Sequence, residues 1–301
     1  MNIPHPFPYQ GSKRRIAHRI LGYFPTDKNV RLFEPFAGSA AISLAAATYR
    51  RANKFIINDA NEPLIELWQN IVNKPEGIIE KYRHLWQEQE GKEQEYYNYV
   101  RDKFNKTKKP EYLLYLLARC VKASIRYNSL GGFNQSPDNR RKGMSPDGMK
   151  ENILRTASLL KGKVEFNSTD YTQILKKINQ NDVVYMDPPY QGVCSARDPR
   201  YIQNIQFGGF VDFLSELNRK RISFIVSYDG RTGNRQHGER LPESLGLVHI
   251  EINAGKSSQA TLLGKSAITY ESVYLSKALL KRVSSVPSAN EEQLELMESF
   301  S

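Results

Sequence analysis

The stretch VVYMDPPYQG, residues 183–192, joins an acid, two prolines and an aromatic ring to the end of an apolar run. Proline cannot donate to the ladder of a central strand, so a buried strand should stop at Asp187. Asp187 and the carbonyl of Pro188, held by Pro189, could accept both N–H bonds of an aromatic amine such as adenine N6 and localise its lone pair. Tyr190 could stack on the same base. The pattern favours a pocket that activates an amine without a covalent nucleophile or metal. The alternative is a strand that ends in a tight turn at the prolines, which would have the same sequence.

A second group of candidate residues is FEPFAGSAA, residues 33–41, which reads as a strand, a glycine turn and the start of a helix. Such a turn presents backbone N–H groups and open space to a ligand. A dinucleotide-binding loop would have three glycines in the pattern G-x-G-x-x-G, whereas this turn has only Gly38 and lacks the P-loop lysine. Glu34, at the strand end, would repel a phosphate and attract a cation. The turn therefore indicates a less anionic ligand.

Asp59 follows the next apolar run, in IINDAN. A carboxylate at this place in a βαβ unit can accept both hydroxyls of a ribose. The segment DANEPLIELW also resembles a helix start, so a helix N-cap is the alternative role for Asp59. Beside the glycine turn we favour the ribose role. Lys13, in YQGSK, precedes a predicted helix, and by itself it is uninformative because a lone lysine is usually a solvated surface group.

Alternating strands and helices must position these residues. We expect a strand at 31–34, a helix at 40–47 and a second strand ending at Asp59, which is the order of a parallel α/β sheet. A mainly helical stretch at 63–125 then interrupts the sheet, and RYNSLGGFNQSPDNRRKGMSPDGMK follows as an exposed hairpin or loop. After a helix at 147–160, strand-like runs resume at KVEFN, DVVYMD, RISFIVSYD, LVHIEI and AITYESVYLS.

The 301-residue chain carries a net charge of +11, which is typical of proteins with a polyanionic partner. The stretch from Arg101 to Lys163 holds 15 Lys and Arg against 5 Asp and Glu, so nearly the whole excess is in the middle segment. No apolar run approaches the ~20 residues of a membrane span, and the start of the sequence has no signal-peptide pattern. Two cysteines favour a reducing cytoplasm, and the five histidines show no metal-ligand spacing.

Four motifs, YQGSK, FEPFAGSAA, NDAN and DPPY, occur in an order that resembles the S-adenosylmethionine-dependent DNA adenine-N6 methyltransferases of the DNA adenine methylase type. The resemblance covers about residues 8–276. It implies a Rossmann-like α/β fold, a mainly parallel twisted sheet with helices on both faces, and an inserted, mainly helical DNA-recognition domain with a hairpin. It also implies S-adenosylmethionine as cofactor, S-adenosylhomocysteine as product, double-stranded DNA as partner and no metal. The chain departs from the family at Ala40, where a second glycine is frequent.

The same resemblance, together with the chemistry above, assigns roles to individual residues. The catalytic residues are expected to be Asp187, Pro188, Pro189 and Tyr190. The residues expected to bind the cofactor are Tyr9, Lys13, Glu34, Pro35, Phe36, Ala37, Gly38, Ser39, Asp59, Asp170, Tyr171 and Asp187. The residues expected to contact DNA are Arg126, Tyr127, Asn128, Ser129, Leu130, Asn134, Arg140, Arg141 and Lys142.

The expected organisation is a catalytic domain at 1–62 and 160–283, an inserted target-recognition domain at 63–159 and a disordered acidic tail at 284–301. The expected reaction is methylation of a flipped adenine in duplex DNA, near the nucleoid of a bacterial or phage-infected cell, with or without a cognate restriction endonuclease. An RNA adenine methyltransferase and a non-catalytic nucleic-acid-binding protein with a relic cofactor fold are the alternatives. Cytosine-N4 and protein-amide methylation are disfavoured, because those enzymes usually carry Ser or Asn in place of Asp187.

Overall fold

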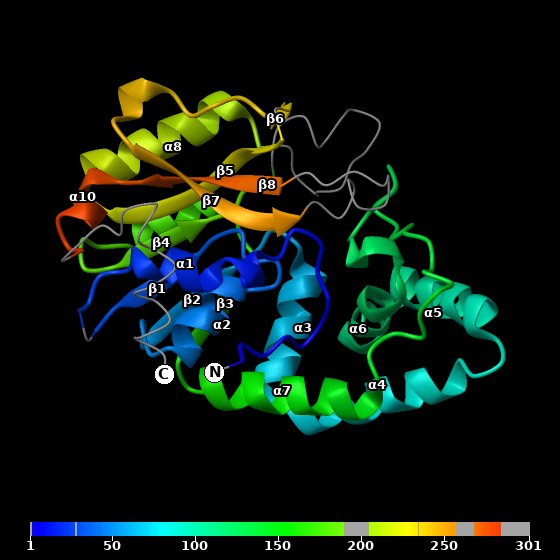
Figure 1. Cartoon of the computed structure of the whole chain (residues 1–301). Coiled ribbons are helices and arrows are strands. Elements are labelled where there is room, and N and C mark those ends of the chain that lie inside the picture. The colour runs from blue at the N-terminus through cyan, green and yellow to red at the C-terminus, as the bar shows by residue number, and fades with distance from the viewer. Residues whose placement is uncertain (1, 28, 190–204, 234, 257–267, 284–301) are drawn as a thin grey trace.

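A single sheet forms the centre of the computed structural model, which describes residues 2–27, 29–189, 205–233, 235–256 and 268–283 (Figure 1). The strands run in the order β3 (Val164–Asn167), β2 (Lys54–Asn58), β1 (Arg31–Glu34), β4 (Val183–Met186), β5 (Ser223–Thr232), β8 (Ile268–Leu275) and β7 (Val248–Lys256), and β6 (Arg235–His237) pairs with β5. In the described part of the chain, no helix is both long and apolar enough to cross a membrane.

The order of the strands identifies the fold class. The strands from β3 to β5 pair in parallel, whereas β8 is antiparallel to both of its neighbours. The order 3-2-1-4-5 is that of a doubly wound sheet, in which ligands bind beyond the carboxyl ends of the strands where the order reverses. That reversal lies between β1 and β4. The predicted Rossmann-like α/β fold is confirmed.

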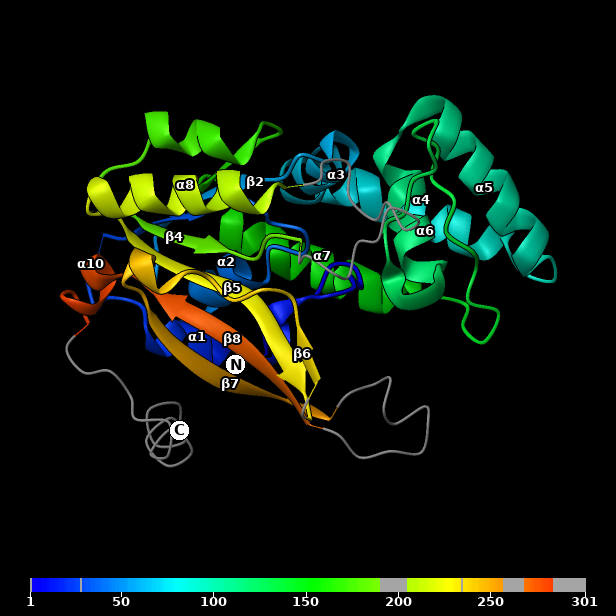
Figure 2. The same ribbon diagram turned by 90° about the horizontal axis from the view of Figure 1, so that it is seen from above.

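Side chains that alternate along each strand give the sheet two apolar faces. Leu32 packs on one face with α1 (Ala17–Gly22) and α2 (Ala41–Thr48), whereas its neighbour Phe33 packs on the other face with α8 (Phe207–Arg219). Figure 2 shows α8 on one side of the sheet and the two other helices on the opposite side. Both sheet faces are therefore covered, as predicted.

The segment between β2 and β3 is mainly helical, as expected. It contains α3 (Glu62–Asn73), α4 (Pro75–Glu88), α5 (Glu93–Thr107), α6 (Pro110–Arg119), η2 (Val121–Ala123) and α7 (Pro146–Leu160). Three of these helices begin with proline, which fits the first helical turn because its missing N–H needs no partner there. In Figure 1, α4, α5 and α6 lie beside the sheet and α7 runs along the bottom toward α4.

The apolar core continues from the sheet face into this helical segment without a break. Two helices assigned above to the inserted domain contact both parts of the chain: α3 contacts β3 as well as α4 and α6, and α7 contacts α2 as well as α4. The domain boundaries at 62/63 and 159/160 therefore stay a prediction. The remaining short elements are η1 (Lys13–Arg15), η3 (Tyr171–Lys176), η4 (Glu243–Leu245) and α10 (Lys277–Leu280).

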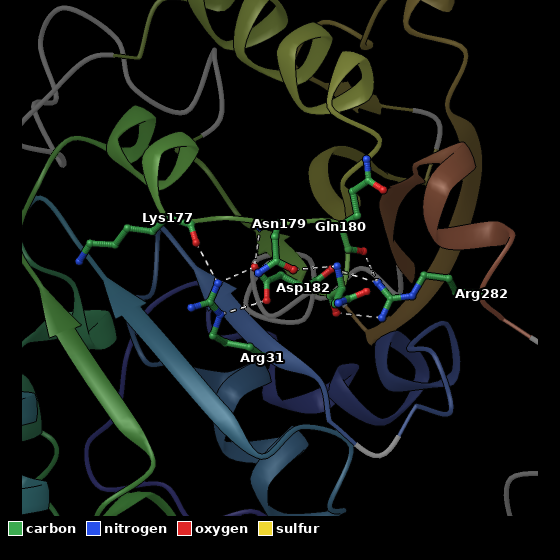
Figure 3. Close-up of polar contacts among 7 residues, drawn as sticks. Arg31, Lys177, Asn179, Gln180, Asp182 and Arg282 are labelled. Carbon is green, nitrogen blue, oxygen red and sulfur yellow. Dashed lines mark hydrogen bonds and ion pairs between the residues drawn. The ribbon is translucent and has the colours of Figure 1, made fainter.

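Two arginines hold the turn that precedes β4 (Figure 3). The guanidinium of Arg31 donates two parallel hydrogen bonds to the Asp182 carboxylate, at 3.0 and 2.7 Å. Arg282 donates to the backbone carbonyls of residues 180, 181 and 182 at 2.9–3.1 Å. Asp182 is 3% exposed, so the two bonds that it accepts from Arg31 are partly shielded from water. They fix the start of the strand whose other end carries Asp187.

Candidate active site

A pocket opens at the carboxyl ends of β1, β2 and β4, at the point where the strand order reverses. It is lined by the N-terminal segment, the turns that follow the strands and part of the helical insertion: Tyr9, Gln10, Gly11, Ser12, Lys13, Glu34, Pro35, Phe36, Ala37, Gly38, Ser39, Ala41, Asp59, Ala60, Asn61, Ile125, Tyr127, Thr169, Tyr171, Tyr185, Asp187, Pro188, Pro189 and Ile205. All predicted cofactor residues except Asp170 are in this lining.

The glycine turn after β1 is built around Gly38, whose φ is +49°. A methyl group at this position would lie 2.8 Å from Cε1 of Tyr9, so only glycine lets the tyrosine ring approach the turn. The indole N–H of Trp68 donates to the Gly38 carbonyl at 2.9 Å. Ala40 also adopts a left-handed conformation, with φ +46°. The missing family glycine is therefore accommodated by backbone strain of roughly 1–2 kcal/mol.

Asp59 joins the glycine turn to the end of β2. Its carboxylate accepts the N–H of Gly38 and the N–H of Asn61, both at 2.9 Å. Burial raises the pKa of Asp59, and these two backbone donors lower it in part. The N-cap of α3 is Asn61, whose side chain accepts from the N–H of Leu64. The alternative role of Asp59 as the N-cap is therefore wrong.

Asn58 is a structural residue of the pocket that the sequence analysis did not identify. Its side-chain N–H groups donate to the carbonyls of Pro35 and Thr169, at 3.0 and 2.9 Å. Its amide oxygen accepts from the N–H and the hydroxyl of Thr169, both at 3.0 Å. One buried amide therefore ties together the turns after three strands. Its only sequence signal is its place before Asp59.

One end of the pocket is aromatic. The rings of Phe36 and Tyr171 lie with centroids 5.0 Å apart, and Phe213 supports Tyr171 at 4.9 Å. Asp170 points elsewhere, because its carboxylate accepts from the N–H of Thr172 at 2.9 Å and caps η3. Its role at the cofactor adenine stays a prediction.

The other end of the pocket contains a buried ammonium between two carboxylates. Lys13 Nζ lies 3.2 Å from Asp187 Oδ1 and 2.6 Å from Glu271 Oε1. Burial acts to lower the pKa of Lys13, but the two carboxylates outweigh it and raise the pKa. No motif of the sequence points to Glu271, which lies far along the chain from the other site residues, in β8.

Glu34 adds another acid to the lining. It is 3% exposed, and its carboxylate accepts from the N–H of Ser43 at 3.0 Å. Burial raises the pKa of Glu34 to about 7, against the opposing effect of the Ser43 hydrogen bonds. Glu34, Asp59 and Asp187 all line the pocket, and Glu271 pairs with Lys13, which lines it as well. Such a site suits a cationic ligand and an amine that gains positive charge.

The predicted hairpin is present, with a bridge between Tyr127 and Phe133. The side-chain oxygen of Asn128 accepts the N–H groups of Leu130 and Gly132 and so shapes the turn. Leu130 is 92% exposed at its tip. Tyr127, predicted to contact DNA, lines the pocket and donates to Asn61 Oδ1 at 3.3 Å. Its contact with a base stays a prediction.

The basic loop is organised by Asp138. This buried carboxylate accepts from Arg140 at 3.0 and 3.2 Å and from Arg141 at 3.0 and 2.7 Å. These hydrogen bonds hold the pKa of Asp138 well below its usual range, and the bond from Arg140 has the larger effect, followed by the bond from Arg141. Lys142 lies 3.2 Å from Glu93. The arginine side chains remain 76% and 63% exposed, and each still presents N–H donors to the solvent.

Tyrosine side chains fix the base of this loop to the helices. Tyr82 and Tyr97 donate hydroxyl hydrogen bonds to the carbonyls of Met144 and Gln135.

Tyr190, Cys194 and the tail at 284–301 lie outside the described residues. Among the residues that are described, no three His, Cys, Asp or Glu side chains are placed to hold a metal ion.

Comparisons with known proteins point to one family. The family model of the D12 class N6 adenine-specific DNA methyltransferases matches residues 9–253. Type II methyltransferase M.FokI of Planomicrobium okeanokoites is 27% identical over 284 residues, which are 88% of this chain and 42% of that protein. Retron Ec67 DNA adenine methylase of Escherichia coli is 31% identical over 62% of this chain and 64% of its own length.

A third relative is a phage protein. The DNA N-6-adenine-methyltransferase of Escherichia phage P1 is 27% identical over 243 residues, which are 76% of this chain and 30% of the phage protein. The chain thus spans less than two thirds of the length of each of these three relatives.

Proposed function

Because the chain belongs to the D12 class of N6 adenine-specific DNA methyltransferases, we propose that it methylates N6 of an adenine flipped out of duplex DNA, using S-adenosylmethionine. One observation carries this proposal. Asp187 and Asp59 line the same pocket on the two sides of the point where the strand order reverses. We assign Asp187 to the amine and Asp59 to the cofactor ribose.

The lining of the pocket provides suitable groups for the adenine, the ribose and the sulfonium of S-adenosylmethionine. Phe36 and Tyr171 provide an apolar surface for the cofactor adenine, and Asp59 provides a carboxylate for the ribose hydroxyls. The acids around Lys13 suit the positive charge of the sulfonium. When bound, the cofactor supplies a methyl group that is ready for transfer to a nucleophile.

Asp187 and Pro188 would act on the target amine. Their carboxylate and backbone carbonyl accept the two N–H bonds, which localises the nitrogen lone pair toward the methyl group. Uptake of the methyl group would leave S-adenosylhomocysteine and would give the amine a positive charge, which it would then lose with one of its protons. The Asp187 carboxylate stabilises that charge more strongly in the transition state than in the ground state. Tyr190 is proposed to stack on the flipped base.

The hairpin and the basic loop would bind the DNA. Leu130 is exposed at the hairpin tip, and Arg140 and Arg141 present guanidinium groups to phosphates. We assign residues 63–159 to target recognition and the remaining described residues to catalysis. We also propose that the chain acts on DNA in the cytoplasm and that a restriction endonuclease cleaving the same DNA site accompanies it.

The test is single-turnover transfer of a labelled methyl group to duplex DNA, single-stranded DNA and RNA, with the modified base identified by mass spectrometry. We expect N6-methyladenine in duplex DNA. Asp187→Ala should lower the transfer rate on the order of 10²–10³-fold, by analogy with preorganised groups at a developing charge. Asp182→Ala, at the opposite end of β4, is the matched control and should lower stability only. Methylated cytosine, or transfer to RNA alone, would contradict the proposal.

A further inference from the structure

Glu271 has no individual role in the function described so far, yet its ion pair with Lys13, at 2.6 Å, is shorter than the one between Lys13 and Asp187, at 3.2 Å. We propose that Glu271 is a positioning residue for methyl transfer, which holds Lys13 against Asp187 and offsets the charge of its ammonium. This inference rests on the proposed function and adds to it a residue outside the motifs of the sequence. According to this inference, the preference of the pocket for a cationic ligand depends on the carboxylate of Glu271.

The first support is geometric. Glu271 lies in β8, which is paired on both sides, with Gly230 of β5 and Ile252 of β7. Its carboxylate therefore projects from a rigid part of the sheet. Lys13 has four rotatable bonds and needs such an anchor to keep one direction. The side chains of Lys13, Glu271 and Asp187 are 10%, 12% and 22% exposed. The three groups therefore form a largely dry cluster.

The second support is charge. Lys13 and Asp187 alone would form a neutral pair, and the ammonium would oppose both a sulfonium and an amine that gains positive charge. Glu271 brings the three groups to a net charge of −1. The three side chains are largely buried, which weakens screening by solvent, so a single added carboxylate has a large effect on cations in the pocket. A purely structural ion pair would have no such preference between charged and neutral ligands.

The pair of cofactor forms offers a direct probe of this preference. S-adenosylmethionine carries a sulfonium, whereas S-adenosylhomocysteine has a neutral thioether at the same position. We therefore take the ratio of their dissociation constants, measured by calorimetry without DNA, as a probe of the charge of the pocket. Contacts that both cofactor forms make contribute equally to the two constants and do not change the ratio. Glu271→Gln removes the charge and keeps an amide oxygen that can accept from Lys13. Glu271→Asp keeps the charge.

We expect Glu271→Gln to weaken S-adenosylmethionine binding about tenfold more than S-adenosylhomocysteine binding. Its single-turnover transfer rate should fall on the order of 10–100-fold, as for groups that orient a ligating residue. Glu271→Asp should keep the binding ratio of the parent chain. Lys13→Gln should shift the ratio in the opposite direction, and this variant tests the charge effect even if Glu271→Gln does not fold.

The matched control is Glu111→Gln. Glu111 is also buried, at 8% exposure, and lies 3.3 Å from Lys81, but it is in α6 and outside the pocket lining. This variant should lose stability and keep both the binding ratio and the transfer rate. Equal losses for the two cofactor forms in Glu271→Gln, or a parent transfer rate, would overturn the inference. A parent chain that binds both cofactor forms but does not methylate adenine contradicts the proposed function instead, while the binding ratio still tests Glu271.

Discussion

The backbone N–H of Gly38 donates a 2.9 Å hydrogen bond to the carboxylate of Asp59. This bond links the turn after β1 to the end of β2, and the acid expected to bind ribose also holds the turn that forms the pocket wall. A single substitution at either residue should therefore affect both the shape of the pocket and its ligand.

Asp59→Ala should weaken binding of S-adenosylhomocysteine at least tenfold. The variant loses acceptors for the ribose hydroxyls, and each hydrogen bond to a charged group is worth ~1.5–3 kcal/mol. Asp182→Ala is the control, because this buried aspartate also accepts hydrogen bonds, three in all, but lies at the far end of the sheet. Calorimetry on the folded variants gives the affinities. Unchanged affinity in Asp59→Ala would refute the ribose role.

Gly38→Ala should lower both stability and cofactor affinity. The new methyl group would meet the Tyr9 ring at 2.8 Å and would also strain a left-handed backbone. Gly91→Ala is the control, since Gly91 has φ +75° and open space around its Cβ position. Both variants bear the backbone cost of roughly 1–2 kcal/mol. The affinity loss should be specific to Gly38→Ala, and similar affinities in the two variants would mean that Tyr9 moves away freely.

Glu34 should make stability depend on pH. Its pKa is raised from 4.5 to about 7 in the folded chain, so between these pH values the folded chain keeps a proton that the unfolded chain loses. The contribution of Glu34 to stability is therefore complete below pH 4.5 and disappears as the pH rises through 7, by at most about 3 kcal/mol. Urea unfolding at several pH values should show this fall in the parent chain. If the curve of Glu34→Gln has the same slope, the acid is ionised in the folded chain.

Replacing Arg140, Arg141 and Lys142 with alanine should flatten the salt dependence of DNA binding. The slope of log affinity against log salt should fall by roughly 0.9 for each phosphate that the variant no longer neutralises. A control variant with Lys220, Lys277 and Lys281 replaced changes the net charge equally at the opposite end of the sheet. Fluorescence anisotropy over a salt series separates the two variants. Equal slopes for both would place the DNA elsewhere.

Leu130→Ala should reduce discrimination between target and non-target DNA. A side chain that contacts a base or inserts between bases acts only where the sequence fits, and one good base contact is worth ~1–3 kcal/mol. Leu154→Ala, on the partly exposed face of α7, removes the same side chain at another surface. The ratio of methylation rates on the two DNAs is the measured quantity. Equal losses on both would make the hairpin tip a backbone contact.

Local signals were sufficient for most of the fold. The strand at 31–34 was predicted at its observed bounds, and the helix at 147–160 within one residue, because proline, glycine and apolar runs mark their ends. The position of Gly38 beside Asp59 also followed from βαβ order, since the carboxyl ends of parallel strands meet at one edge.

Other site residues depend on contacts that sequence does not encode locally. Glu271 reaches Lys13 only because β8 lies antiparallel beside β5, and no motif marks that pairing. The role of Asn58 depends on three turns that converge on one amide. Similarly, the basic residues at 140–142 did not indicate that the Asp138 carboxylate accepts hydrogen bonds from Arg140 and Arg141 and holds their side chains.

The strand order also has a consequence for how the chain folds during synthesis. β1 ends at Glu34, but its partner β4 begins only at Val183, after the whole helical segment has been made. Helices α4, α5 and α6 make contacts close in sequence, which form quickly, whereas the pairing of β1 with β4 closes a long loop and is slow. A nascent chain therefore has α4, α5 and α6 formed while β4 is still inside the ribosome. Slowing translation before residue 183 should be harmless, whereas truncation there should leave an unpaired edge of β1 that promotes aggregation.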